Sequence, residues 1–109
     1  MSSKPKFSEE HKQIALIAKA LSHPARVYIM EKLSCMSTCC TSGEMIDDIP
    51  IARSTLSQHL KELKLAGLIQ GNIDPPQIRY CINQQNWNEA KKLLTSFLKK
   101  NTSSNKEPC

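Results

Sequence analysis

The chain has 109 residues, which is the length of one domain. It contains 15 Lys and Arg and 10 Asp and Glu, and the resulting formal charge of +5 suits a polyanionic partner. The longest apolar run, Ile14–Ala18, is too short to cross a bilayer, and residues 1–13 lack the apolar core of a signal peptide, so we expect a cytoplasmic protein with no membrane partner. Five cysteines, an odd number, are not expected to form a disulfide scaffold in that reducing compartment.

The first half of the chain is predicted to form three helices. Ser8, followed by two glutamates, is typical of a helix start, and apolar residues at helical spacing come after it. Pro24 suits the first turn of a second helix. Thr41 and Glu44 match a capping box, which predicts a short third helix that ends before Pro50.

The segment Ile51–Ile69 predicts a fourth helix with two different sides. Leu56, Leu60 and Leu63 recur at steps of four and three, the spacing of one helix face. Gly67 is a natural stop for this helix because glycine adopts the left-handed conformation of a C-terminal cap. The opposite side carries hydroxyls, an amide and basic groups, so it either faces solvent or touches a partner.

The pattern changes after the fourth helix. Residues 68–73 and 77–82 are strand-like and flank Asp74-Pro75-Pro76, a turn whose prolines stiffen the tip, so one β-hairpin is predicted. Asn83 is expected to cap a last helix. Residues 101–109 form a polar tail.

This order of elements predicts a mainly α (α+β) fold, a winged helix-turn-helix with about five helices and one β-hairpin wing. Residues 8–100 are expected to form the single DNA-binding and dimerisation domain between a flexible N-terminus (1–7) and a flexible tail (101–109). A short helix, a tight link around Pro50–Ala52 and a helix that begins with polar residues are typical of a helix-turn-helix, whose second helix enters the major groove of DNA.

Short polar side chains at the start of the fourth helix suit contacts with base edges and phosphates. His59 lies between the leucine stripe and the polar side, so it either packs inside or reaches a phosphate. We expect only a weak contribution from the wing, since one arginine lies near its tip. The predicted DNA-binding residues are Arg53, Ser54, Thr55, Ser57, Gln58, His59, Lys61, Lys64 and Arg79.

The segments Leu21–Arg26 and Ser57–Leu68 resemble the ArsR/SmtB family of bacterial winged-helix repressors, and the resemblance extends over roughly residues 8 to 98. It implies a homodimer, joined through the first and last helices, that represses a promoter and releases DNA when a metal, metalloid or oxidant reaches it. The broad apolar faces of these two helices agree with such an interface, for which the expected residues are Ile14, Ile17, Leu21, Trp87, Ala90, Leu94 and Phe97.

The chain departs from the family pattern at several positions. Ala52 stands where a polar helix cap is usual, so either Ser54 caps a later start or the helix begins less well stabilised by about 1 kcal/mol. His23 stands where the family often has Asp or Asn before the proline. The positions of the usual Cys-x-Cys site are Thr41 and Gly43, which do not ligate soft metals, and the last helix lacks the histidine of a zinc site.

The cysteines offer a different candidate sensor. Cys35, Cys39 and Cys40 suit a three-sulfur site for As(III) or another thiophilic ion acting as inducer, or a redox pair. The alternative is that they are small buried hydrophobic side chains near the join between two helices. Cys81 is expected to pack within a strand, and Cys109 ends the tail.

These observations predict a DNA-binding transcriptional regulator, a homodimeric repressor of double-stranded operator DNA that is released by a thiol-reactive or metalloid signal. A winged-helix protein-interaction module and a ligand-independent DNA-binding regulator are the alternatives. An enzyme is not expected, because the chain has no Gly-rich phosphate loop, no nucleophile elbow and no catalytic His, Asp and Ser set.

Overall fold

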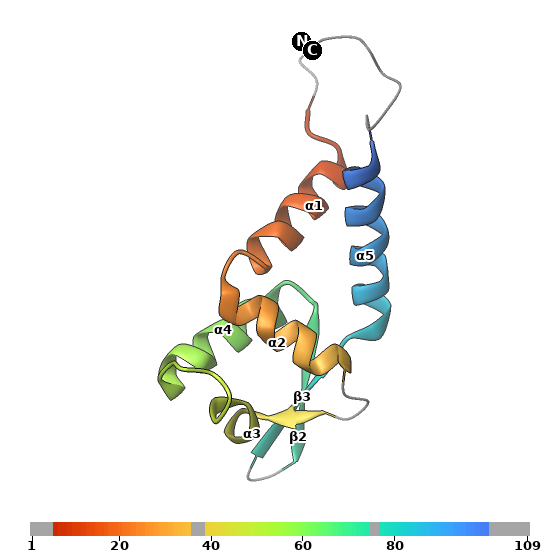
Figure 1. Cartoon of the computed structure of the whole chain (residues 1–109). Coiled ribbons are helices and arrows are strands. Elements are labelled where there is room, and N and C mark those ends of the chain that lie inside the picture. The colour runs from red at the N-terminus through yellow and green to blue at the C-terminus, as the bar shows by residue number, and fades with distance from the viewer. Residues whose placement is uncertain (1–5, 36–38, 75–76, 101–109) are drawn as a thin grey trace.

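The computed structural model describes residues 6–35, 39–74 and 77–100. Within these ranges it contains five helices and three strands (Figure 1), namely α1 (Glu9–Ala20), α2 (Pro24–Cys35), β1 (Cys40–Thr41), α3 (Ser42–Ile46), α4 (Arg53–Leu65), β2 (Ile69–Asp74), β3 (Gln77–Ile82) and α5 (Gln84–Lys99). The predicted winged helix-turn-helix is confirmed. The predictions for residues 1–5, for the two prolines of the hairpin tip and for residues 101–109 fall outside the described residues.

The sheet has one strand more than the sequence predicted. β1 pairs antiparallel with β3, which also pairs with β2, so that the strand order is β1-β3-β2. β1 has only two residues, Cys40 opposite Tyr80 and Thr41 opposite Arg79. Two residues are too few to show an alternating pattern, and pairing with β3 makes this segment a strand.

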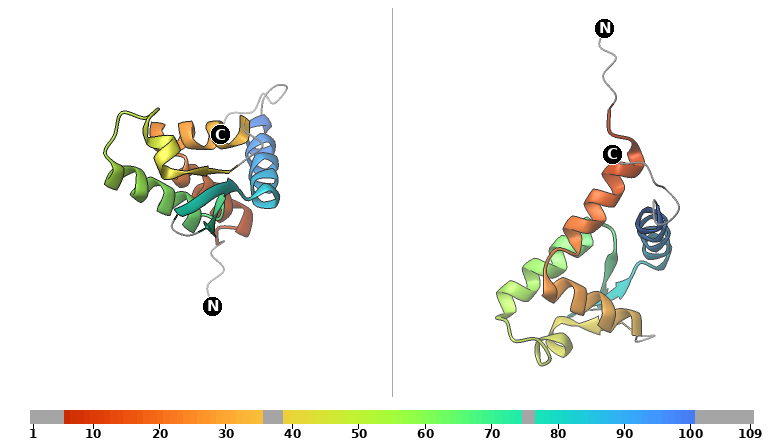
Figure 2. Two further views of the ribbon diagram at one scale, coloured as in Figure 1. Left: turned by 90° about the horizontal axis from the view of Figure 1, so that it is seen from below. Right: turned by 45° about the horizontal axis from the view of Figure 1, so that its top comes forward.

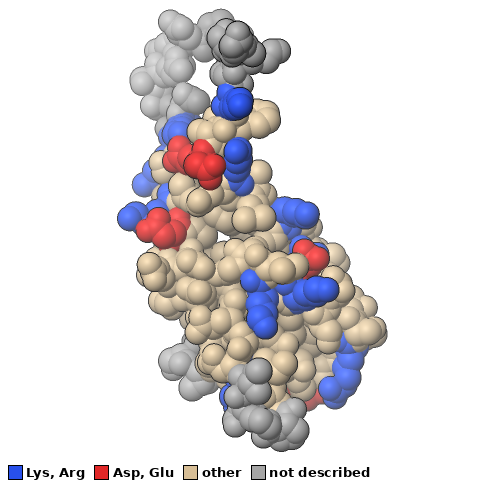
Figure 3. Space-filling model, turned by 180° about the vertical axis from the view of Figure 1, so that it is seen from behind, with Lys and Arg blue, Asp and Glu red and all other residues tan. Residues whose placement is uncertain are grey.

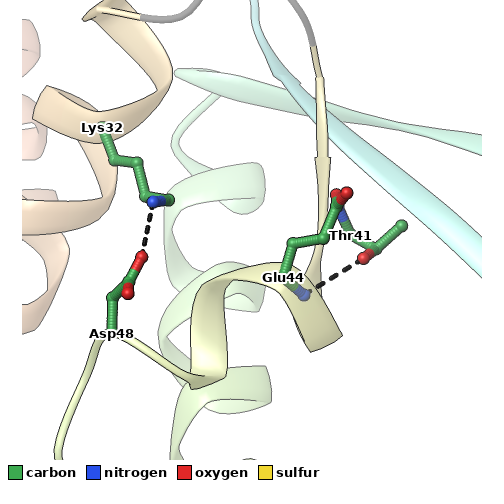
Figure 4. Close-up of polar contacts among 4 residues, drawn as sticks. All are labelled: Lys32, Thr41, Glu44 and Asp48. Carbon is green, nitrogen blue, oxygen red and sulfur yellow. Dashed lines mark hydrogen bonds and ion pairs between the residues drawn. The ribbon is translucent and has the colours of Figure 1, made fainter.

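Side-chain caps fix the starts of α1 and α3 as predicted, and at α1 the cap is also reciprocal, through His11, which the sequence did not indicate. The Ser8 hydroxyl accepts a hydrogen bond from the His11 N–H (3.1 Å), and His11 Nδ1 accepts one from the Ser8 N–H (3.2 Å). At α3, the Thr41 hydroxyl accepts from the Glu44 N–H (3.2 Å), and the Glu44 carboxylate accepts from the Thr41 N–H at 2.8 Å (Figure 4). Both boxes satisfy N–H groups that a helix start leaves without partners.

Gly67 terminates α4 as the sequence predicted. Its φ is +81°, and its N–H donates to the carbonyl of Lys64 while the Leu68 N–H donates to that of Leu63. This is the Schellman arrangement, in which two hydrogen bonds close the last turn and a left-handed residue redirects the chain. Leu63 and Leu68 are both buried beside it, so the cap also fixes where β2 begins.

The core lies where the helices of the lower half meet the sheet, and α1 and α5 extend from it side by side (Figures 1 and 2). An ion pair joins Lys32 of α2 to Asp48 after α3 (2.6 Å; Figure 4). In the described ranges, no helix is long and apolar enough to span a membrane. The most deeply buried large side chains are Ile29, Met45, Leu56, Leu60, Leu63 and Leu68.

Replacing Gly67 by alanine is expected to destabilise the protein by about 1–2 kcal/mol, because a left-handed φ is strained for any residue with a Cβ. The added Cβ would also lie 3.0 Å from Nδ2 of Asn86, which donates a hydrogen bond to the Gly67 carbonyl. Urea denaturation measures the loss. Gly43→Ala is the matched control, since its Cβ has ordinary space within a helix, and it is expected to stabilise the protein by about 0.5–1 kcal/mol. Equal stability of Gly67→Ala and wild type would contradict this assignment.

Candidate nucleic-acid interface

One side of α4 is buried and the other carries polar groups into solvent. Leu56, Leu60 and Leu63 are at most 1% exposed and hold the helix against the core. Seven of the eight predicted DNA-contacting residues between positions 53 and 64 are exposed, namely Arg53, Ser54, Thr55, Ser57, Gln58, Lys61 and Lys64. We call these seven side chains the α4 face.

The α4 face combines short hydrogen-bonding groups with positive charge. Ser54, Thr55 and Ser57 carry hydroxyls, and Gln58 donates from Nε2 to the Glu62 carboxylate over 3.4 Å. On the side of the molecule opposite to Figure 1, Lys and Arg side chains are interspersed with Asp and Glu side chains (Figure 3). On the α4 face itself, Arg53, Lys61 and Lys64 supply positive charge. Such a surface attracts a polyanion and can donate and accept hydrogen bonds at close range.

The start of α4 has no side-chain cap. Ala52 occupies the N-cap position, with φ −72° and ψ 156°, and its methyl group cannot accept a hydrogen bond from the first turn. Of the two alternatives that the sequence left open, the structure therefore has the uncapped start at Ala52. The first N–H groups of α4 lie beside exposed Arg53 and Ser54, at the positive end of the helix dipole.

The structure corrects the expectation that His59 contacts DNA. Its side chain is buried, with 6% exposure, and Arg26 Nε donates a hydrogen bond to its Nδ1 at 3.0 Å. The His23 ring lies against it, with the two ring centroids 4.3 Å apart. His59 Nε2 is buried and has no hydrogen-bond partner among the described residues. His59 therefore supports α4 from inside and does not belong to the α4 face.

His23, the residue before Pro24, caps the start of α2. Its Nδ1 accepts a hydrogen bond from the Ala25 N–H at 3.0 Å, within the first turn of α2. Arg26, next in that turn, also donates from Nη1 to the Lys19 carbonyl of α1 (3.2 Å). Through Arg26 and the two rings, the end of α1 and the start of α2 are joined to α4. The sequence shows the residues of this cluster but not that they converge, because Arg26 and His59 are 33 positions apart.

Burial lowers the pKa of His59 below its ordinary value of 6.5, and the nearby His23 and Arg26 add to this effect while Glu62 opposes it. The neutral ring is therefore favoured in the folded protein. Between that lowered pKa and 6.5, the unfolded chain holds a proton on His59 that the folded protein does not hold. This contribution to stability is complete above pH 6.5 and is lost as the pH falls through the lowered pKa.

We expect the free energy of unfolding to fall more steeply from pH 7 to pH 5 in wild type than in His59→Gln. The reason is that glutamine removes the buried group whose protonation opposes folding. Urea denaturation across this pH range measures the difference. His11→Gln, which replaces an exposed histidine and retains an N3 acceptor for the α1 cap, is the matched control and should keep the wild-type slope. Identical slopes in wild type and His59→Gln would contradict the account.

Arg79 lies on the wing strand β3, but close to α3. Its Nη1 is 3.9 Å from the Glu44 carboxylate, and its side chain is 43% exposed. The hydrogen bond from the Thr41 N–H lowers the pKa of Glu44, and Arg79 contributes to that effect. Arg79 therefore links the wing to the start of α3. A DNA phosphate that contacts Arg79 would compete with the Glu44 carboxylate for its guanidinium group.

The cysteines are arranged differently from the prediction. Cys39 forms a disulfide bond with Cys81 of β3, with the two Cα atoms 4.5 Å apart, so both the expected absence of disulfides and a packing role for Cys81 are corrected. Cys40 is buried, and this burial raises the pKa of its thiol. The Cys35 side chain lies outside the described residues. Among the residues that are described, no three His, Cys, Asp or Glu side chains gather as metal ligands.

The predicted dimer residues divide into three groups by exposure. Ile17 and Ala90 are buried in the core of the chain itself, at 7% and 2% exposure, so they are not available as an outer contact surface. Phe97 of α5 is 49% exposed. Two apolar residues outside the predicted set, Leu16 of α1 and Leu98 of α5, are 51% and 70% exposed. The remaining predicted residues are partly buried, namely Ile14, Leu21, Trp87 and Leu94.

Comparison with known proteins agrees with this architecture. Residues 23–70 match the family described as "Bacterial regulatory protein, arsR family". The HTH-type transcriptional regulator YgaV of Escherichia coli K12 is 36% identical over 87 residues, which cover 80% of this chain and 83% of YgaV. The chain belongs to the arsR family. It is a transcriptional regulator and not an enzyme, as the sequence predicted.

Two further relatives extend the comparison. The arsenical resistance operon repressor of Staphylococcus xylosus is 34% identical over 53 residues, 49% of each chain. The structure of an ArsR-like transcriptional regulator from Rhodococcus sp. RHA1 superimposes with a TM-score of 0.69 over 83% of each chain, at 21% identity. The similarity to the Rhodococcus structure supports only the assignment of the fold.

Proposed function

We propose that this arsR-family regulator is a homodimeric repressor that reads double-stranded operator DNA with the α4 face. The observation that carries the proposal is the exposure of seven polar or basic side chains on one side of a helix whose other side is buried in the core. In a helix-turn-helix, that second helix is the one that enters the major groove. The basic groups would contact phosphates, and the hydroxyls and the amide would contact base edges.

Two copies of the chain would present two α4 faces to one duplex. The exposed apolar side chains of Leu16, Phe97 and Leu98 on α1 and α5 suggest where the copies meet, since a monomer gains nothing from leaving them in water. α1 and α5 lie side by side and extend away from the half that contains α4 (Figure 1). Dimerisation through this end would leave both α4 faces open to DNA.

The double variant Ser57→Ala/Gln58→Ala is expected to weaken binding to the DNA upstream of the gene by about 1–3 kcal/mol, because each side chain that reads a base contributes on this scale. Lys61→Ala is expected to weaken specific and scrambled DNA alike and to lower the salt slope by about 1. Fluorescence anisotropy at several salt concentrations measures both effects.

Lys99→Ala is the control for charge, because it removes a lysine from the last turn of α5, far from α4. It should leave the preference for upstream over scrambled DNA unchanged. If the Ser57 and Gln58 double variant binds upstream DNA as tightly as wild type, the α4 face does not read sequence and the proposal fails.

A winged-helix module that binds only proteins is the competing function. A face used for that purpose would gain from having few uncompensated charges, whereas Arg53, Lys61 and Lys64 are all exposed around the hydroxyls. A heparin or DNA column at rising salt separates the two functions. We therefore favour DNA as the partner.

We also propose that chemistry at cysteine sulfur releases the repressor. The name of the Staphylococcus xylosus relative makes arsenite a candidate inducer. As(III) binds thiolate sulfur, so it would act on reduced protein, in which Cys39 is not bonded to Cys81. Cys35, Cys39 and Cys40 remain the proposed ligands for that state.

Arsenite is expected to lower the DNA affinity of the reduced protein, and Cys39→Ser should abolish the response because it removes one ligand. Cys109→Ser, which alters only the tail cysteine, is the control and should respond as wild type does. Titration of the DNA complex followed by anisotropy measures this effect. If arsenite lowers the DNA affinity of Cys39→Ser as much as that of wild type, Cys39 takes no part in the mechanism.

A further inference from the structure

The Cys39–Cys81 bond joins the wing to the segment that opens the helix-turn-helix. β1 pairs with β3 at Cys40↔Tyr80 and Thr41↔Arg79, and Cys39 and Cys81 lie one position further along the same register. Their separation of 42 residues makes this bond a link between distant parts of the chain. It lies at the end of a strand that has only two residues of its own.

The bond adds a covalent link to a short strand pairing, because β1 has two residues. Two register pairs of β1 and the 3.9 Å ion pair between Arg79 and Glu44 are among the contacts that join this strand and the start of α3 to β3. Arg79 and Glu44 are both about half exposed, so water and salt weaken their attraction. A covalent link at this point therefore adds a constraint between the wing and the start of α3 that salt and water do not weaken.

The same segment leads directly to α4. Thr41, the last residue of β1, is the N-cap of α3 and exchanges hydrogen bonds with Glu44. α3 packs against α4. A change in how β1 lies on β3 thus moves the wing relative to the helix pair that would read DNA.

We propose that the Cys39–Cys81 bond is a reversible thiol–disulfide switch that fixes the wing to α3, so that its reduction by a dithiol lowers the affinity of the protein for DNA. The inference rests on the proposed function, since the affinity concerned is that of the α4 face. A wing that is already ordered loses less conformational freedom on binding than a loosened one. The bonded form should therefore bind more tightly.

The surroundings of the two sulfurs suit such an exchange. Both cysteines are half-buried, so part of each side chain is open to solvent and to a thiol reagent. Asn72 Nδ2 donates a hydrogen bond to Cys81 Sγ at 3.4 Å. This donor stabilises a developing thiolate on Cys81, which makes Cys81 the better leaving group and directs attack to Cys39.

The exchange balances as two thiolate displacements. One thiolate of the dithiol forms a bond to Cys39 Sγ, and the disulfide electron pair departs with Cys81 Sγ. The second thiolate of the reductant attacks its own sulfur in this mixed disulfide, which frees Cys39. The protein gains two electrons and, once both sulfurs are protonated, two protons, while the dithiol becomes a cyclic disulfide. Oxidation by glutathione disulfide reverses the change and yields two molecules of glutathione.

The test equilibrates the full chain with dithiothreitol or with glutathione disulfide and follows three quantities. Alkylation and peptide mass spectrometry give the fraction of Cys39–Cys81 bond, hydrogen exchange gives the protection of the β1 and β3 amides, and anisotropy gives the affinity for upstream DNA. Reduction of wild type is expected to weaken DNA binding about tenfold, within the usual range for coupled sites, and to lower the protection of both strands.

Cys39→Ser/Cys81→Ser should bind DNA like reduced wild type under both conditions, and Cys109→Ser should behave like wild type because it keeps the pair. The switch is overturned if the bond does not form with glutathione disulfide, if it forms without changing strand protection or affinity, or if the double variant responds equally. If no form binds upstream DNA at low salt, the proposed function fails and so does the claim about affinity. Redox-dependent protection of β1 and β3 in wild type would then still support the structural link between wing and α3.

Discussion

The burial of one leucine stripe fixes the orientation of every polar side chain on α4. Leu56, Leu60 and Leu63 are almost fully enclosed, and burying each stabilises the fold by about 2 kcal/mol. Rotating α4 about its axis would expose these side chains and bury hydroxyls, an amide and basic groups without partners. The exposed face is thus a consequence of the core, and the caps at Thr41 and Gly67 set where the helix pair begins and ends.

A polar cluster adds a second constraint on α4. Arg26 bridges the end of α1 and His59 of α4, and His23 caps α2 while its ring lies on His59. Because neutral His59 accepts the Arg26 hydrogen bond inside the protein, the arrangement depends on an uncharged ring. The α4 face is therefore supported from behind by apolar packing and by one charge-assisted hydrogen bond.

The fold could be predicted from the sequence wherever the signal was local. Capping boxes, the glycine stop, the leucine spacing and the two strand-like runs all lie within a few residues, and the elements that they predict are present. β1, the burial of His59 and the Cys39–Cys81 bond could not be predicted, because each depends on residues 33 or more positions apart. For the candidate site, periodicity separated exposed from buried positions except at His59, which lies on the boundary between them.

We propose that two α4 faces occupy one duplex, each anchored by its leucine stripe. Methylation protection of guanine N7 in the major groove, with the full-length protein on the DNA upstream of its gene, distinguishes this arrangement from the alternatives. We expect two protected segments whose centres lie about 10 bp or a multiple of that apart, bound by a species of twice the chain mass. Unprotected guanines at saturating protein, or a single segment bound by one chain, would contradict it.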